Sequence, residues 1–273
     1  MKISLCSIGF RRTAQPLSDI IPIVADLGFD GIEIWGEHIK DTEPCEIAST
    51  LADSGLEASM ISPYFDFTGP TAVREKSVAD ADVFIDYAAA INAPLIRVFT
   101  GVVGSLEADR GQFDACAASL REVCDKAAAS GVGMALETHP KTLVDTVPGS
   151  LTLLEAVDRP NLKLNLDIYH LWEVHFDPVA VLEWLFEHTG HVHAKNAKIQ
   201  PNSHYPLLHD QQASQDIIGV TPMAEGNMPY TGFLKSLKRK GFNGYVSVEW
   251  FGPDVEKTAA GELAYLRDIF NGR

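Results

Sequence analysis

Met134-Ala135-Leu136-Glu137 and Leu164-Asn165-Leu166-Asp167 are two short apolar runs that each end in a carboxylate. Both have the length of a buried strand, and each is followed by a plausible helix or by a loop leading to one. The same alternation continues along the whole chain in both directions. It predicts strands at residues 3–5, 31–35, 56–61, 95–99, 132–137, 162–167, 191–195 and 245–250.

Eight strand–helix units predict an α/β protein with a single (β/α)8 TIM barrel, a fold of about 250 residues. The chain has 273 residues, of which 46% are hydrophobic, enough for one large core, and no linker divides residues 1–273 into separate domains. A doubly wound sheet would show a Gly-rich phosphate turn after an early strand, and Cys6-Ser7-Ile8-Gly9-Phe10 is not one.

Two details refine the predicted barrel. Gly28-Phe29-Asp30-Gly31 and Gly241-Phe242-Asn243-Gly244 precede the second and eighth strands, and each indicates a helix C-cap glycine with a tight turn. A long connection at about residues 197–229 follows the seventh strand. Because active sites of TIM barrels lie at the carboxyl ends of the strands, we expect this connection to be a lid.

The chain is acidic, with 37 Asp and Glu against 22 Lys and Arg and a net charge of -15. This charge repels nucleic-acid phosphates and anionic lipid, so neither nucleic acid nor a membrane is an expected partner. A small anionic substrate would need local positive charge from a metal, Arg or Lys. The sequence leaves a homo-oligomer open.

We expect a cytoplasmic protein with reduced thiols. No apolar run approaches the roughly 18 residues of a membrane span, and Arg11-Arg12 interrupts the N-terminus before a signal-peptide core can form. The four cysteines form no Cys-x-x-Cys pair, so a cysteine metal site is not expected.

Four polar residues lie near the carboxyl ends of predicted strands, namely Glu137, Asp167, His193 and Glu249. Three carboxylates and an imidazole at one mouth would repel one another, whereas a divalent cation turns the repulsion into coordination. We therefore predict one bound divalent metal. Ligands with oxygen and nitrogen atoms and no thiolate favour Mn²⁺, with Mg²⁺, Co²⁺ or Fe²⁺ as alternatives.

Further polar residues are expected around this metal. Since side chains two apart on a strand share a face, His139 follows Glu137, and Lys195 follows His193, toward the same mouth. His191, two residues before His193, is interpreted as a hydrogen-bonded core residue. The other candidate site residues are Arg97 near the end of the fourth strand, His170 just past the sixth, and Glu33, His38 and Tyr64 beside the second and third.

Several stretches resemble the xylose-isomerase-like barrel superfamily, which includes sugar epimerases, inosose dehydratases and endonuclease IV. They are residues 31–36, 136–140, 165–170, 191–196 and 247–252. More narrowly, residues 4–11, 136–145 and 158–173 resemble the bacterial 3-dehydroshikimate dehydratases of the petrobactin type. Residues 197–221 show little match.

The narrower resemblance implies conversion of 3-dehydroshikimate to protocatechuate and water, with a metal held by Glu137, Asp167, His193 and Glu249. Removing the proton from the carbon next to the ketone would give an enolate, which can expel the C5 hydroxyl on the following carbon. A metal would stabilise this enolate as a Lewis acid. Arg97 and Lys195 are the candidate anchors for the substrate carboxylate. His170, with His139 as the competing choice, is the expected proton-transfer residue.

Three alternatives remain at the sequence level. A ketose or inosose epimerase, isomerase or dehydratase would use the same metal site. A DNA-repair endonuclease should show a basic surface and more zinc ligands, which the net charge of -15 opposes. A metal-dependent binding protein would bind a ligand without turnover. The sequence does not distinguish siderophore synthesis from quinate and shikimate catabolism.

Overall fold

Eight parallel strands close into a barrel in the order β1-β10-β7-β6-β5-β4-β3-β2. The computed structural model describes residues 1–40, 42–198 and 219–272. The barrel strands are β1 (Lys2–Cys6), β2 (Gly31–Trp35), β3 (Glu57–Ser62), β4 (Leu95–Val98), β5 (Gly133–Glu137), β6 (Leu162–Asp167), β7 (Thr189–Ala194) and β10 (Tyr245–Val248). The predicted TIM barrel is confirmed.

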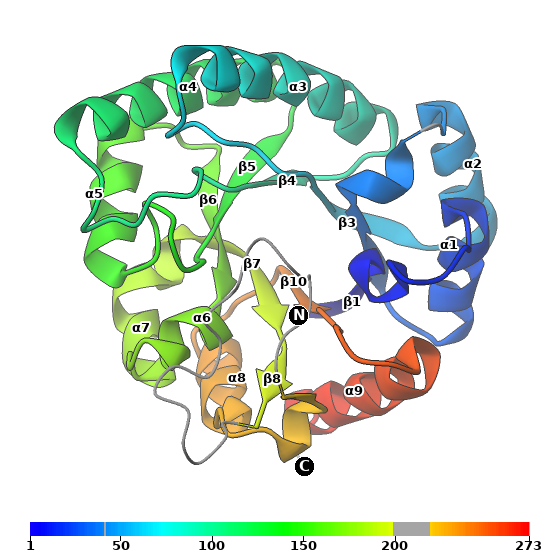
Figure 1. Ribbon diagram of the computed structural model, residues 1–273. Helices are drawn as coiled ribbons and strands as arrows, with labels where there is room; N and C mark the ends of the chain where they lie inside the picture. The colour runs from blue at the N-terminus through cyan, green and yellow to red at the C-terminus, as the bar shows by residue number, and fades with distance from the viewer. Residues whose placement is uncertain (41, 199–218, 273) are drawn as a thin grey trace.

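Helices surround the strands on the outside of the barrel (Figure 1). They are α1 (Leu17–Asp26), α2 (Pro44–Ser54), α3 (Thr71–Ala90), α4 (Arg110–Ala129), α5 (Val147–Val157), α6 (Ile168–Glu173), α7 (Pro178–Leu185), α8 (Tyr230–Arg239) and α9 (Val255–Phe270). Short 3-10 turns are η1 (Ser7–Phe10), η2 (Gly36–Ile39), η3 (Phe186–His188) and η4 (Met223–Glu225). None of the helices in the described residues is both long enough and apolar enough to cross a membrane.

The strands are buried on both faces because the helices cover the outside and side chains fill the inside. All five residues of β2 are buried, as are the last four of β5 and of β6. Packed apolar residues surround the buried polar side chains of these strands and hold them in fixed positions.

Local signals in the sequence place the helix ends. Gly28 and Gly241 have φ of +90° and +86°, just after α1 and α8, which confirms the two predicted C-cap glycines. Asp109 caps α4 by accepting a hydrogen bond from the backbone N–H of Gln112. The turns at Gly28 and Gly241 return the chain to the amino ends of β2 and β10.

The connection after β7 differs from a plain loop in its described parts. Asn196–Ala197 (β8) pairs antiparallel with Val220–Thr221 (β9), and η4 follows. Glu262 of α9 accepts a hydrogen bond from the backbone N–H of Met223 at 2.7 Å, which ties η4 to the barrel wall. The predicted lid at 197–229 includes residues 199–218, which lie outside the described residues.

Candidate active site

The four predicted metal ligands meet at the carboxyl ends of their strands. Glu137 and Asp167 are the last residues of β5 and β6, His193 lies in β7, and Glu249 directly follows β10. The backbone N–H of Glu249 donates to Ala194 O at 3.0 Å, so the strand pairing reaches this residue. An oxygen of each carboxylate lies 3.7 Å from His193 Nδ1.

The atoms at the centre of this cluster fit a divalent cation. Glu137, Asp167 and His193 each offer a ligand atom, and these atoms lie within 4.8 Å of one another. His193 Nδ1 and Asp167 Oδ1 are buried and have no hydrogen-bond partner among the described residues. Since an unpaired buried polar atom costs free energy, a cation bound here would satisfy both atoms. Coordination by the four residues remains a prediction.

Lys195 lies against the same carboxylates. Its Nζ is 2.5 Å from Asp167 Oδ2 and 2.5 Å from Glu249 Oε2. Burial, which would lower the pKa of this lysine, is outweighed by the two carboxylates, so its pKa lies well above the ordinary value. The ammonium group is therefore charged and partly neutralises the cluster.

Arg97 forms the other side of the cluster. Its Nη1 donates to Glu137 Oε2 at 3.2 Å, and its Nη2 donates to the backbone oxygens of Ser62 and Pro63, each at 3.2 Å. The guanidinium lies 4.7 Å from the ring centre of Tyr64 and 4.6 Å from that of Phe99. In this structure both cations expected to anchor a substrate are thus paired with candidate metal ligands.

Two histidines lie beside Glu137. The ring centres of His139 and His170 are 4.4 Å apart, and both residues can reach a common ion with Glu137. His139 Nδ1 is 2.9 Å from Pro140 O, and His170 Nδ1 is 2.5 Å from Glu173 Oε1. Burial lowers the pKa of His139, so this ring is neutral near pH 7 and can accept a proton.

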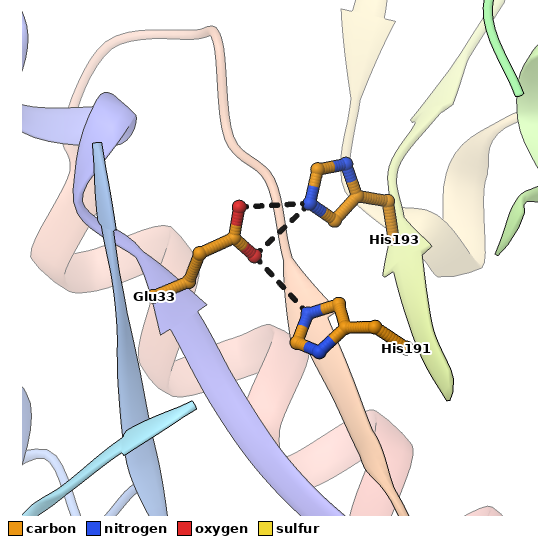
Figure 2. Close-up of side chains that lie close together, drawn as sticks. All are labelled: Glu33, His191 and His193. Atoms are coloured by element: carbon orange, nitrogen blue, oxygen red, sulfur yellow. Dashed lines mark hydrogen bonds and ion pairs between the residues drawn. The ribbon is translucent and has the colours of Figure 1, made fainter. Parts of the chain in front are cut away.

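The carboxylate of Glu33 contacts two histidines (Figure 2). His193 Nε2 lies 2.9 Å and 3.0 Å from its two oxygens, and His191 Nε2 lies 3.2 Å from Oε2. Glu33, which the sequence predicts to bind substrate, is 0% exposed, and substrate binding by this residue stays a prediction. The interpretation of His191 as a hydrogen-bonded core residue is confirmed.

The electrostatics around Glu33 favour a charged carboxylate. Burial would raise the pKa of Glu33, but the charge of His193 and the hydrogen bonds from both histidines hold it well below the ordinary value. Burial likewise would lower the pKa of His193, and Glu33, Glu249 and Glu137 together hold it well above. The metal-free cluster therefore favours a protonated His193 ring, and a bound cation would replace the proton on Nδ1.

Tyr64 and His38 lie at the rim. Tyr64 is 46% exposed, its ring stacks on Phe99 with centres 5.6 Å apart, and its hydroxyl accepts from Trp35 Nε1 at 3.2 Å. His38 Nδ1 is 3.0 Å from Ser7 Oγ, and burial lowers its pKa to about 4. The two residues remain candidate walls for a substrate pocket.

Three residues of the site were not identified from the sequence. Ser62 donates to Glu33, Phe99 stacks on Tyr64, and Glu173 bonds His170. Only Glu173 carries a local signal, because it lies three residues after His170 on α6 and so shares its helix face. Ser62 and Phe99 lie at strand ends whose partners are distant in sequence.

The sequence pattern of the xylose isomerase-like TIM barrel family matches residues 21–269. The chain therefore belongs to this family. It is 33% identical, over 97% of its own length and 96% of the relative's, to a 3-dehydroshikimate dehydratase of Bacillus anthracis. The crystal structure of a probable 3-DHS dehydratase involved in petrobactin synthesis in that organism superposes with a TM-score of 0.86 and 31% identity, covering 100% of both chains.

Some relatives of lower identity carry the names of other enzymes. A fructoselysine 3-epimerase of Shigella flexneri is 24% identical over 91% of this chain and 90% of that protein. The resemblance to the dehydratases identified from sequence motifs is therefore confirmed, and it is closer than the resemblance to this epimerase.

Proposed function

We propose that this chain is a metal-dependent 3-dehydroshikimate dehydratase, which converts 3-dehydroshikimate to protocatechuate and water. The observation that carries the proposal is the cluster of three carboxylates around His193 Nδ1, with His139 and His170 beside it. Support for the dehydratase reaction comes from the Bacillus anthracis relative, at 33% identity over 97% of this chain.

Glu137, Asp167, His193 and Glu249 would hold the metal, with Mn²⁺ as the expected ion. When bound, the cation supplies positive charge that stabilises the negative charge developing on the substrate carbonyl oxygen. The chain's own residues hold the ligands in register and keep water away from them, since all four are at most 3% exposed.

His139 and His170 are the candidates for moving protons. The reaction removes a proton from the carbon beside the ketone, expels the neighbouring hydroxyl and then rearranges to the aromatic ring, so a base and an acid are both required. His139 Nδ1 faces the carbonyl of Pro140, which only accepts, so a neutral ring carries its lone pair on Nε2 and can take the first proton there. His170 is the expected partner for the leaving hydroxyl.

The substrate is a small anion, and the proposal assigns its carboxylate to Arg97 or Lys195. Both are buried within the cluster and both are fully charged, since burial is outweighed by the surrounding carboxylates, which raise the pKa of each. Substrate binding therefore requires one of these cations to share its charge between a carboxylate of the chain and that of the substrate.

A direct assay tests the proposal. Pure protein with Mn²⁺ and 3-dehydroshikimate should produce the ultraviolet absorbance of protocatechuate, and the same mixture with a chelator should not. An epimerase or isomerase using this metal site would return the proton instead of eliminating water, and it would give no new aromatic absorbance. That outcome, with turnover of a ketose, would replace the dehydratase proposal.

A further inference from the structure

The carboxylate of Glu33 accepts hydrogen bonds from three side chains, and Figure 2 shows the two histidines among them. His193 Nε2 is 2.9 Å and 3.0 Å from its oxygens, His191 Nε2 is 3.2 Å from Oε2, and the Ser62 hydroxyl donates to Oε1. Glu33, Ser62 and both histidines are 0% exposed. No solvent competes for these bonds, so they fix the positions of the rings.

The direction of the bonds determines where the His193 ring carries its proton. An ionised carboxylate only accepts, so Nε2 of His193 must be the donor toward Glu33. A neutral ring with a proton on Nε2 has its lone pair on Nδ1. That nitrogen is the one that lies 3.7 Å from oxygens of Glu137, Asp167 and Glu249.

We propose that Glu33 is a positioning residue that holds His193 with Nδ1 directed into the metal site, while His191 and Ser62 hold Glu33 in place. The inference rests on the proposed function only in taking the four-residue cluster as a metal site. A carboxylate behind a ligating histidine fixes its tautomer and orientation and makes the ring a stronger donor. Glu33 would act in this way without contacting the substrate.

Glu33, His191 and His193 also lie close enough to hold an ion themselves. Their nitrogen–oxygen distances of 2.9 to 3.2 Å are those of hydrogen bonds. Ligand atoms about 2.1 Å from a tetrahedral ion would be roughly 3.4 Å apart. The distances and the Ser62 hydroxyl together favour a hydrogen-bonded cluster over a second metal site.

Glu33→Gln tests the inference because the amide has the size and shape of the carboxylate but lacks its charge and one of its acceptor oxygens. An amide offers one acceptor oxygen, and its nitrogen donates, so three donors cannot all be satisfied and the His193 ring must rotate or change tautomer. Isothermal titration of the metal-free protein with Mn²⁺ should show an affinity about 10- to 100-fold weaker than wild type. Circular dichroism verifies that the variant folds.

The matched control is Glu262→Gln, the same change in another buried carboxylate. Glu262 lies in α9 and accepts a hydrogen bond from the backbone N–H of Met223, away from the cluster. Its variant should bind Mn²⁺ with wild-type affinity. Equal affinity in Glu33→Gln, Glu262→Gln and wild type would overturn the inference.

A direct readout is the nitrogen NMR spectrum of the histidine rings in the Zn²⁺-loaded protein. The wild type should show His193 with a proton on Nε2 and none on Nδ1, and Glu33→Gln should alter this pattern. A wild-type His193 that carries its proton on Nδ1 would overturn the inference, as would a wild-type chain that binds no Mn²⁺.

Ser62→Ala provides a second variant in case Glu33→Gln does not fold. It removes one donor to Glu33 without touching His193, so a smaller loss of Mn²⁺ affinity is expected, and unchanged affinity would count against the inference. These binding measurements need no substrate. A wild type that binds Mn²⁺ in a Glu33-dependent way but makes no protocatechuate would overturn the proposed function alone.

Discussion

Arg97 lies between one carboxylate, two backbone carbonyls and two aromatic rings, and it is 2% exposed. The positive charge of Arg97 therefore compensates the negative charge of Glu137 in the free protein. A substrate carboxylate can bind Arg97 only if the guanidinium interacts with both carboxylates. Removing this side chain should affect stability and substrate binding together, through two different partners.

Arg97→Ala should raise KM by about 10- to 100-fold, because a charged hydrogen bond contributes about 1.5 to 3 kcal/mol in substrate and transition state alike. It should also lower the free energy of unfolding of the metal-free protein by about 3 kcal/mol, since Glu137 loses its buried partner. Steady-state kinetics and urea unfolding measure the two effects. Arg159→Ala, which breaks a more exposed pair with Asp125, is the control. An unchanged KM would leave Lys195 as the candidate anchor for the substrate carboxylate.

His170 is held by Glu173 and lies beside His139. His170→Ala should lower kcat by about 10²- to 10⁴-fold if it moves a proton in the slow step. The metal content should stay near that of wild type, because the four predicted ligands remain. Stopped assays with metal analysis check both, with His188→Ala of η3 as the control. A variant with unchanged kcat would leave the role to His139 or Lys195.

Residues at strand ends could be predicted from sequence, whereas their partners could not. Glu137, Asp167 and His193 were found because a polar group at the end of an apolar run is visible in one stretch of sequence. The bonds of Glu33 join residues 158 and 160 positions apart, from β2 to β7. Only closure of the barrel brings the side chains of these two strands together in one small interior, so no local pattern reveals the pairing.

At the scale of elements, the strand pattern carried most of the fold. The predicted strand at 31–35 matches β2, and that at 162–167 matches β6, because apolar residues recur at every second position between turn residues. The pair β8 and β9 was missed, since strands of two residues have no periodicity to detect. Their pairing depends on contacts made after the chain turns back.

Helix α9 contains a carboxylate whose charge should affect stability. Glu262 is 4% exposed, and burial raises its pKa from 4.5 to about 7. Below about pH 4.5 the folded and unfolded chains both hold this proton. Between about pH 4.5 and 7 the unfolded chain has released it and the folded chain retains it, so the free energy of unfolding falls as pH rises.

We expect this single group to cost about 3 kcal/mol of stability between pH 4 and 8. Glu262→Gln keeps an acceptor for Met223 and removes the ionisable group. As pH rises, its free energy of unfolding should therefore increase by about this amount relative to that of the wild type. Urea unfolding of both proteins at pH 5 and pH 8, in chelator, gives the difference. Glu256→Gln, an exposed change on the same helix, should show no such trend. A constant difference between Glu262→Gln and wild type would contradict the assignment.

At the scale of the whole molecule, the net charge of -15 and the carboxylates at the barrel mouth both oppose the binding of an anion. The surface repels anions. Within the cluster the carboxylates repel one another, and Lys195 and Arg97 offset part of this repulsion. A divalent cation relieves the second repulsion and makes the site attractive to an anionic substrate. Binding should therefore stabilise the entire barrel, since strands β5, β6, β7 and β10 all end at this cluster.

Adding Mn²⁺ at about 100 times its dissociation constant should stabilise the folded chain by roughly 2.7 kcal/mol. For a chain of this size that corresponds to a rise in Tm of about 5 to 10 °C. Exhaustive dialysis against a chelator should lower Tm by the same amount and abolish formation of protocatechuate, and Mn²⁺, Co²⁺ or Mg²⁺ should restore both. Asp167→Asn should shrink the Mn²⁺-dependent rise, and it should also lower the metal-free Tm, because the buried ammonium of Lys195 loses one of its carboxylate partners. Full activity in dialysed protein that contains no divalent metal, together with a Tm that does not respond to Mn²⁺, would refute the metal site.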